Sequence, residues 1–278
     1  HRGSHLSIAS KPQINGLMPK LYHHPFCPQS RFVRLILAEY GIDVTLIEER
    51  AAERRHEFLL LDPAGRTPVL VDDDGTVVPG AGVIAEYLDE TLGPDYRGPR
   101  LMPQSLSARV ETRRLVDWFN VKFFEEVTNW LVTEKVHKRF LAPEIGGGAP
   151  EMDVVRVARS NIRHHMRYIG YLTAARKWLA GDSLTYADFA AAAHISCADY
   201  LGDVPWGEDE SAKHWYQRIK SRPAFRPLLA DRDFRPTPPP PSIDRVYRRQ
   251  GWPGSRGMPD ASHPTSCPRL SARCFVES

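Results

Sequence analysis

The first part of the chain alternates short β-like runs with amphipathic helical runs. In the helical run 29–40, Val33, Ile36, Leu37 and Tyr40 recur at i, i+3, i+4 and i+7, and Gly41 follows as a stop signal. The order βαβ and then ββα predicts an α/β unit whose first two strands are parallel and joined by a right-handed crossover. The expected strands are 20–23, 44–48, 69–71 and 76–78, and the expected helices are 29–40, 53–61 and 82–92.

The pattern changes after Pro103, where the strand signals end. Long helical patterns follow and are separated by glycine and proline clusters, which predicts an all-helical bundle. These patterns cover 105–140, 153–180, 186–200 and 212–221. We therefore expect an α/β domain over 18–98 and an all-α domain over 104–235.

The two ends of the chain differ from the middle. Residues 1–17 form a patternless polar run typical of an expression leader, with Met18 as the expected native start. Residues 236–278 form a proline- and arginine-rich tail that we expect to be extended, with a local exception at 243–247.

Charge and composition exclude several classes of function. The net charge of +3 comes from the two ends, so residues 18–235 carry about −2, which argues against nucleic-acid binding. No apolar run is long enough to predict a transmembrane helix. Four scattered cysteines do not match a disulfide framework or a zinc site, so we expect a cytoplasmic protein. The adjacent pairs His23–His24 and His164–His165 lack further ligands at suitable spacing, and we predict no metal site.

Several motifs together resemble the cytosolic glutathione transferase family over about residues 20–231. They are the Thr67-Pro68-Val69 turn, the runs 178–182 and 185–188, and the run 222–225. The resemblance implies a thioredoxin-like N-terminal domain followed by an all-α C-terminal domain. In and beside the run 185–188, Thr185 and Asp188 have the spacing of a capping box, and Leu184 and Phe189 that of a hydrophobic staple. Both motifs are folding devices.

Cys27 and Ser30 stand at the start of the first expected helix, where main-chain amides and the helix dipole favour a thiolate. In the family this position activates glutathione, so the resemblance implies Cys27 as nucleophile and Ser30 as its partner if the chain is an enzyme. The alternative is a small buried cysteine that caps a turn. Thr67-Pro68 resembles the family's cis-proline turn beside glutathione, and here the alternative is a purely architectural turn.

Gly80 and Ala81 stand where the family has an acid and a serine that hold the γ-glutamyl end of glutathione. Each lost charge-assisted hydrogen bond removes about 1.5–3 kcal/mol, so losing two or three weakens binding by about three orders of magnitude. We therefore predict weak or absent glutathione binding, no cofactor and no catalytic residue. The vestigial glutathione site would comprise Cys27, Ser30, Thr67, Pro68, Gly80 and Ala81. The alternative is a thiol-type glutathione transferase or lyase that uses Cys27.

Five aromatic residues crowd one helical pattern of the second domain: Trp118, Phe119, Phe123, Phe124 and Trp130. They form either the core of the bundle or a surface for a second subunit or a partner.

The run 20–40 is also similar to a group of transferase-like division proteins of alphaproteobacteria that bind the tubulin homologue FtsZ. This resemblance implies a non-enzymatic homodimer that binds FtsZ filaments at the division site, alters their curvature or bundling, and supports constriction. The candidate FtsZ-binding segment lies in the tail, where apolar and aromatic residues are flanked by charged ones. The alternative is that this tail is a solvated, disordered segment. The candidate segment comprises Ile243, Asp244, Arg245, Tyr247, Arg248 and Arg249.

Overall fold

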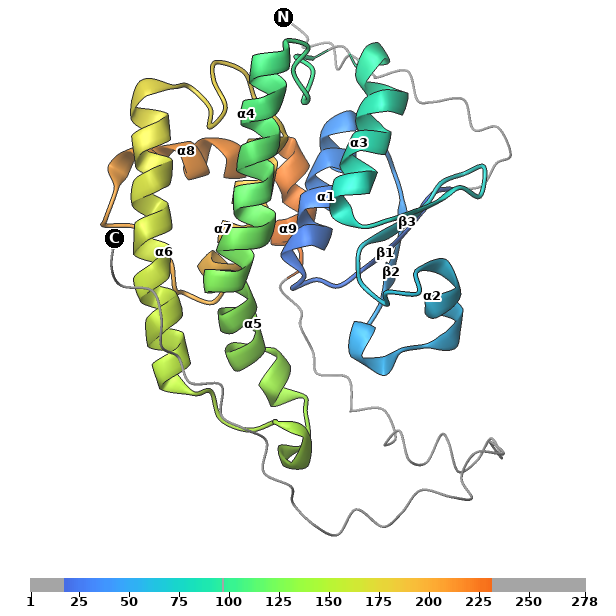
Figure 1. The fold of residues 1–278 in the computed structure, drawn as a ribbon, viewed down its shortest axis with the longest axis vertical. Coiled ribbons are helices and arrows are strands. Elements are labelled where there is room, and N and C mark those ends of the chain that lie inside the picture. Colours follow the sequence, from blue (N-terminus) through green and yellow to red (C-terminus); the bar gives the residue numbers. More distant parts are fainter. Residues whose placement is uncertain (1–17, 97, 232–278) are drawn as a thin grey trace, which may run out of the picture. The chain divides into compact units, whose positions relative to one another are not determined.

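The computed structural model describes residues 18–96 and 98–231. The N-terminal domain is a four-stranded mixed sheet with the strand order β2-β1-β3-β4 (Figure 1). The strands β1 and β2 are parallel, and β3 is antiparallel to both β1 and β4. The elements are β1 (Lys20–His23), α1 (Pro28–Tyr40), β2 (Thr45–Glu48), α2 (His56–Leu61), β3 (Val69–Val71), β4 (Val77–Pro79) and α3 (Ala81–Leu92). The predicted βαβ-ββα order and the parallel first pair are confirmed.

The helix α1 follows from its sequence pattern. Its four predicted apolar positions are all buried, and Gly41 ends it with a φ of 71°, a left-handed conformation that glycine adopts without steric cost. The predicted helix 53–61 is shorter than expected. A 3₁₀ turn (Ala51–Glu53) precedes α2, and Arg54 between them has a φ of 45° that no helix can continue.

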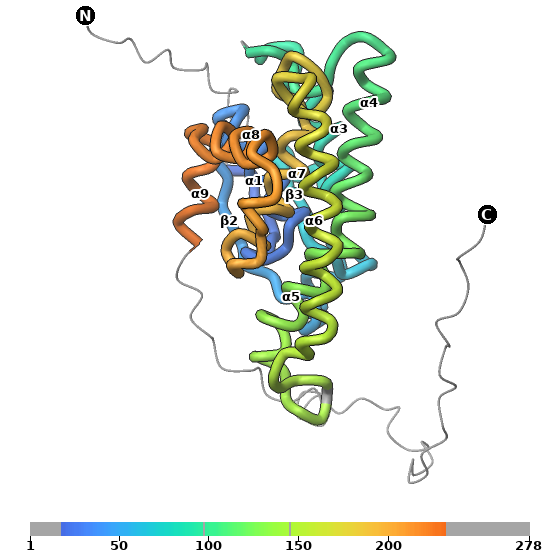
Figure 2. Tube along the Cα trace, turned by 90° about the vertical axis from the view of Figure 1, so that its left-hand side faces the viewer, coloured from blue at the N-terminus to red at the C-terminus, as the bar shows by residue number. Residues whose placement is uncertain are grey.

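The C-terminal domain is helical, as predicted. Figure 2 shows α3 and α4 on the side of the molecule opposite α8 and α9. The helices are α4 (Leu106–Asp117), a π-helical segment (Trp118–Thr128), α5 (Asn129–Lys135), α6 (Met152–Ala175), α7 (Tyr186–Tyr200), α8 (Glu210–Lys220) and α9 (Arg226–Leu229).

Two expected helices differ from the observed ones. The run 105–140 was expected as one helical pattern, but α4 passes into the π-helical segment and α5 stops at Lys135. No proline or glycine marks either change. The pattern 153–180 also ends early, because the main chains of Trp178 and Gly181 pair in a tight turn beyond α6.

The helix α7 lies at the centre of the bundle, and all of its residues from Tyr186 to Ala198 are buried. Asp188 in its first turn is fully buried and accepts hydrogen bonds from Thr185 N at 3.0 Å, Leu179 N at 3.0 Å and Trp215 Nε1 at 2.9 Å. The predicted capping box is therefore present, and its carboxylate also joins three segments of the domain.

The two domains share one hydrophobic core and several polar contacts. The hydroxyls of Tyr40 and Tyr186 lie 2.8 Å apart in the interior. Arg31 on α1 donates to Ser196 Oγ on α7 at 2.9 Å. These contacts fix α1, which carries Cys27 at its start, against the helical domain.

Candidate functional site

Cys27 is the N-cap residue of α1 and is half-buried. Its sulfur accepts the main-chain N–H of Ser30 at 3.4 Å. The thiol lies 3.5 Å from Gln29 Oε1 and 3.6 Å from the carbonyl oxygen of Thr67. The sulfur thus both caps the helix and faces the Thr67–Pro68 turn, so this geometry is compatible with either interpretation of Cys27.

Ser30 is fully buried, and its hydroxyl oxygen accepts the main-chain N–H of His24 at 3.3 Å. Ser30 contacts Cys27 through its main-chain nitrogen, while its side chain ties α1 to the preceding loop. The rings of His24 and His137 meet edge to face in the same region, with centroids 5.8 Å apart. Burial, with a smaller effect of His137, lowers the pKa of His24 to about 4.

The Thr67–Pro68 peptide bond is cis, as the family resemblance implies. The carbonyl oxygen of Pro68 accepts the N–H of Gly80 at 3.0 Å, so this turn is joined directly to the start of α3. Cys27, the turn and the start of α3 are thus connected, and their role as a vestigial glutathione site stays a prediction.

Gly80 is the N-cap of α3 with a φ of 87°. No side chain caps this helix start among the described residues, and its first turn contains no acid. Ala81, the first helical residue, is buried. The start of α3 therefore offers main-chain amides alone where the family places a carboxylate and a hydroxyl.

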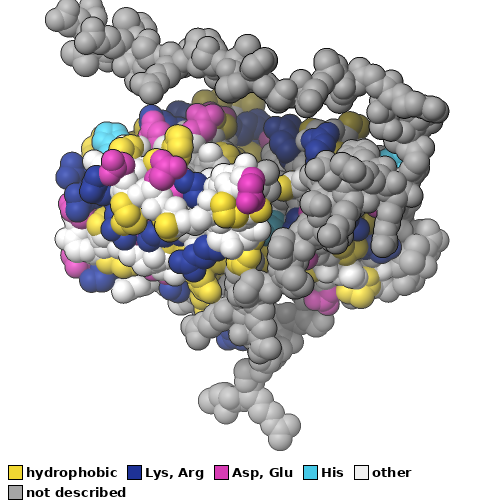
Figure 3. All heavy atoms as spheres, turned by 90° about the horizontal axis from the view of Figure 1, so that it is seen from below, with side chains coloured by type: hydrophobic (Ala, Val, Ile, Leu, Met, Phe, Trp, Pro, Cys, Tyr) yellow, Lys and Arg dark blue, Asp and Glu magenta, His cyan; other side chains and the backbone are white. Residues whose placement is uncertain are grey.

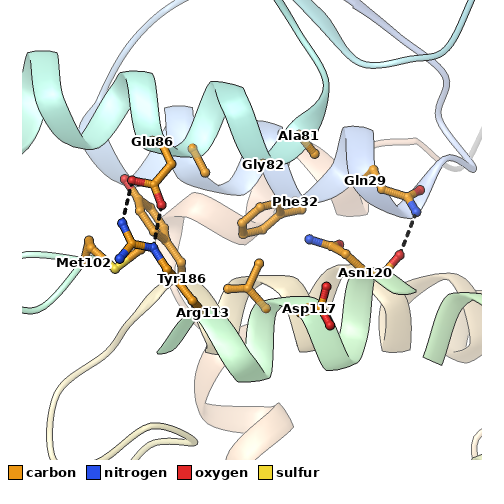
Figure 4. A pocket seen from close by; sticks show the side chains of 12 residues that line it. Gln29, Phe32, Ala81, Gly82, Glu86, Met102, Arg113, Asp117, Asn120 and Tyr186 are labelled. Carbon is orange, nitrogen blue, oxygen red and sulfur yellow. Dashed lines mark hydrogen bonds and ion pairs between the residues drawn. The ribbon is translucent and has the colours of Figure 1, made fainter. Parts of the chain in front are cut away.

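A cavity of about 510 Å³ lies between α1, α3 and the helix α4 with its π-helical continuation (Figure 4). Gln29 and Asn120 lie at one end, Glu86 and Arg113 at the other, and Phe32 lies between them. Gln29 Nε2 donates to the carbonyl oxygen of Asn120 at 3.4 Å. Of the predicted site residues that the structure describes, Ala81 alone lines this cavity. Its lining comprises Gln29, Phe32, Ala81, Gly82, Ala85, Glu86, Met102, Arg113, Val116, Asp117, Asn120 and Tyr186.

A buried histidine supports this cavity and was missed by the sequence analysis. His194 on α7 is fully buried, with Nε2 3.2 Å from Asn120 Oδ1 and Nδ1 3.0 Å from Thr128 Oγ1. Burial lowers the pKa of His194 to about 3, so the neutral ring holds the Asn120 amide in place. The sequence signal that could have indicated this buried histidine is its position directly after four alanines in an apolar helix.

The five predicted aromatics divide between core and surface. Phe119 and Phe123 are fully buried, Phe124 is half-buried, and Trp130 is 45% exposed. Trp118 is half-buried and donates to His165 Nδ1 at 3.1 Å.

The structure places one histidine that was considered for metal binding and one acidic cluster that was not. His165 is fully buried, and its Nε2 lies 2.9 Å from Glu126 Oε2. Asp72, Asp73 and Asp74 bring three carboxylates within 4.8 Å of one another. They occupy the β3–β4 turn, where Asp72 and Asp74 accept main-chain N–H groups, so their placement follows from turn formation.

Some predictions fall outside the described residues: the leader 1–17, and the tail with Ile243, Asp244, Arg245, Tyr247, Arg248 and Arg249. Within the part that is described, no helix has the length and apolar character needed to span a membrane. On the described surface in Figure 3, Lys and Arg are interspersed with Asp and Glu.

Comparison with known proteins agrees with this geometry. The N-terminal domain model of glutathione S-transferases matches residues 21–100, and the C-terminal domain model matches residues 153–223. FtsZ-localized protein A of Caulobacter vibrioides is 43% identical over 215 residues, which cover 76% of this chain and 91% of that protein.

Two solved structures have the same fold. A glutathione S-transferase from Sinorhizobium meliloti is 52% identical with a TM-score of 0.76, and the match covers 80% of this chain and 96% of that one. FzlA from C. crescentus is 41% identical with a TM-score of 0.73, and the match covers 81% and 97%. With both domain models matched in order and relatives similar over most of their length, the chain belongs to the glutathione S-transferase family.

Proposed function

We propose that this protein is a non-enzymatic regulator of cell division that binds FtsZ filaments at the division site in the cytoplasm. Its similarity to FtsZ-localized protein A supports the partner. The start of α3 carries the argument against catalysis, because Gly80 and Ala81 supply neither the carboxylate nor the hydroxyl that would hold glutathione. In a transferase fold that lacks these two glutathione-binding groups, the part that functions is the protein surface.

The proposed regulator is a homodimer, which gives each assembly two equivalent filament-binding heads. Two heads bind neighbouring subunits or filaments with higher avidity than one and can change filament curvature or bundling, which supports constriction. An exposed apolar row on α3 and α4 is the proposed dimer face: Val83, Leu106 and Val110 are 58%, 80% and 67% exposed. The Glu86–Arg113 ion pair joins the two helices within this face.

Sedimentation with polymerised FtsZ tests the proposal. We expect the protein to pellet with FtsZ polymer and to stay in the supernatant when FtsZ is kept unpolymerised with GDP. Electron microscopy of the same samples would show curved or bundled filaments. A protein that stays in the supernatant at every FtsZ concentration would contradict the proposal.

The alternative is a thiol-type glutathione transferase or lyase. The position of the Cys27 sulfur favours it, since this sulfur sits at the α1 N-terminus and faces the cis-proline turn. Such an enzyme would catalyse glutathione conjugation or a glutathione-dependent reduction, and the Cys27→Ala variant would lose that activity. Cys197→Ala is the matched control, because Cys197 is the other free cysteine of the described residues and is fully buried, with its sulfur 3.8 Å from the carbonyl oxygen of Phe26.

A further inference from the structure

A second cavity, of about 130 Å³, shares no lining residue with the one between α1, α3 and α4. Three segments build it: the loop before α1, the end of α5 with the turn after it, and the end of α7. We call it the Phe26–Tyr200 cavity. It is lined by Phe26, Lys135, Val136, Arg139, Phe140, Tyr200 and Leu201.

The walls of this cavity are mostly apolar. The rings of Phe26 and Tyr200 meet edge to face with centroids 5.2 Å apart. Phe26 and Val136 are buried in a small cluster separate from the main core, whereas Tyr200 is 47% exposed and carries the wall to the surface. Because an apolar cavity of about 150 Å³ accepts benzene, this one fits a single aromatic or branched aliphatic side chain.

The charge around the cavity is positive. Lys135 Nζ lies 2.6 Å from Asp203 Oδ2, and Arg159 shares the same buried carboxylate at 2.7 Å. Arg139 is exposed, and no carboxylate of the described residues forms an ion pair with it. Asp203 compensates the charge of Lys135, so Arg139 is the lining cation that attracts a ligand with negative charge next to its apolar part.

We propose that the Phe26–Tyr200 cavity binds one apolar side chain carried by an acidic segment of a partner protein, with Arg139 pairing with the flanking carboxylates. Naming FtsZ as that partner rests on the proposed function. The chain's own tail, 236–278, has six arginines and three acids, so its net positive charge disfavours the tail as the ligand of this cavity.

A direct binding measurement tests the cavity without FtsZ. The probe is an acetylated, fluorescently labelled pentapeptide with phenylalanine between two pairs of aspartates, and a peptide with lysines in place of the aspartates is its control. We expect Arg139→Glu to weaken binding of the acidic peptide by about tenfold or more, since it replaces an attraction with a repulsion. Tyr200→Ala should weaken it by about fivefold or more, because it removes one wall.

Lys177→Glu is the matched control variant, with the same change of charge at an exposed site beyond the far end of α6. It should leave peptide affinity within about twofold. Unchanged affinity in Arg139→Glu, equal affinity for the lysine peptide, or no binding of the acidic peptide to the wild-type protein would each overturn the proposal.

Sedimentation with FtsZ polymer then identifies the partner. If FtsZ supplies the acidic segment, Arg139→Glu pellets less than the wild type, and Lys177→Glu pellets normally. The acidic peptide could bind and lose affinity in Arg139→Glu and Tyr200→Ala while the wild type does not pellet with FtsZ. That result would support peptide binding in the cavity and contradict FtsZ as the partner. Normal pelleting of Arg139→Glu would contradict the role of the cavity in FtsZ binding.

Discussion

The carboxylate of Glu86 on α3 accepts two parallel hydrogen bonds from the guanidinium of Arg113 on α4, at 2.9 and 3.0 Å. The hydrogen bonds from Arg113, with a smaller direct effect of its charge, lower the pKa of Glu86. Both side chains are largely exposed, so the pair adds little to stability. Its geometric effect is larger, because it joins the two domains beside the cavity and inside the proposed dimer face.

The proposed dimer face predicts the effect of a charge at its centre. Val110→Glu should convert the dimer to a monomer in mass photometry, because two carboxylates would meet across a two-fold axis in an apolar contact. Val157→Glu on α6 is the control, since Val157 is also exposed, at 58% against 67% for Val110, but lies outside this face. Dimers that persist in Val110→Glu, or a monomeric wild type, would contradict this face.

Restoring the missing carboxylate and hydroxyl should restore glutathione binding. The double variant Gly80→Glu, Ala81→Ser returns a carboxylate and a hydroxyl to the start of α3, and a Cβ at Gly80 meets no atom within 4 Å. The φ of 87° costs a residue with a side chain about 1–2 kcal/mol. The regained hydrogen bonds outweigh this, and calorimetry should detect affinity about tenfold higher or more.

Gly80→Ala is the control for this variant, because it carries the same backbone strain without a carboxylate. It should not bind glutathione better than the wild type. An equal gain in Gly80→Ala, or no gain in the double variant, would show that the start of α3 does not limit glutathione binding.

Asp188 is predicted to be the most sensitive capping residue in the helical domain. Asp188→Ala leaves Trp215 Nε1 and two main-chain N–H groups buried without their acceptor, so the free energy of unfolding should fall by about 3 kcal/mol or more. Urea denaturation measures the change. Asp182→Ala at an exposed position should change it by less than about 0.5 kcal/mol. Equal losses in the two variants would refute this role.

Buried histidines predict acid lability. Burial lowers the pKa of His165 to about 4, which its contact with Glu126 partly opposes, and burial lowers that of His194 to about 3. The unfolded chain takes up these protons near pH 6.5 while the folded chain does not, so stability is present above pH 6.5 and falls as the pH drops toward 4.

Urea denaturation at several pH values between 7.5 and 4.5 tests this dependence. His194→Gln should make the decline shallower by up to about 1.4 kcal/mol per pH unit, because one titrating group is removed. A free energy of unfolding that is constant or rises on acidification would contradict the prediction.

Local signals made much of the fold predictable. The apolar spacing in α1 and its glycine stop gave the helix end at Tyr40, and the Thr185–Asp188 spacing gave the capping box of α7. The π-helical segment after Asp117 had no such signal, because no proline or glycine marks it in the sequence. The segment packs against α6 and α7.

The candidate site was predictable where the family resemblance assigned its residues. Cys27, the Thr67–Pro68 turn and the start of α3 were expected together and do lie together. Gln29, Asn120 and His194 were not expected. Their contacts join positions 91 and 74 residues apart. The first joins the two domains and the second joins two helices of the C-terminal domain, so both depend on tertiary packing.

In the proposed function, this transferase fold binds a polymer and does not turn over glutathione. Sedimentation of the wild-type protein with polymerised FtsZ, in the presence of millimolar glutathione, tests both parts in one sample. We expect saturable pelleting with the polymer that glutathione does not alter. Protein that remains in the supernatant while the same sample consumes glutathione would contradict it.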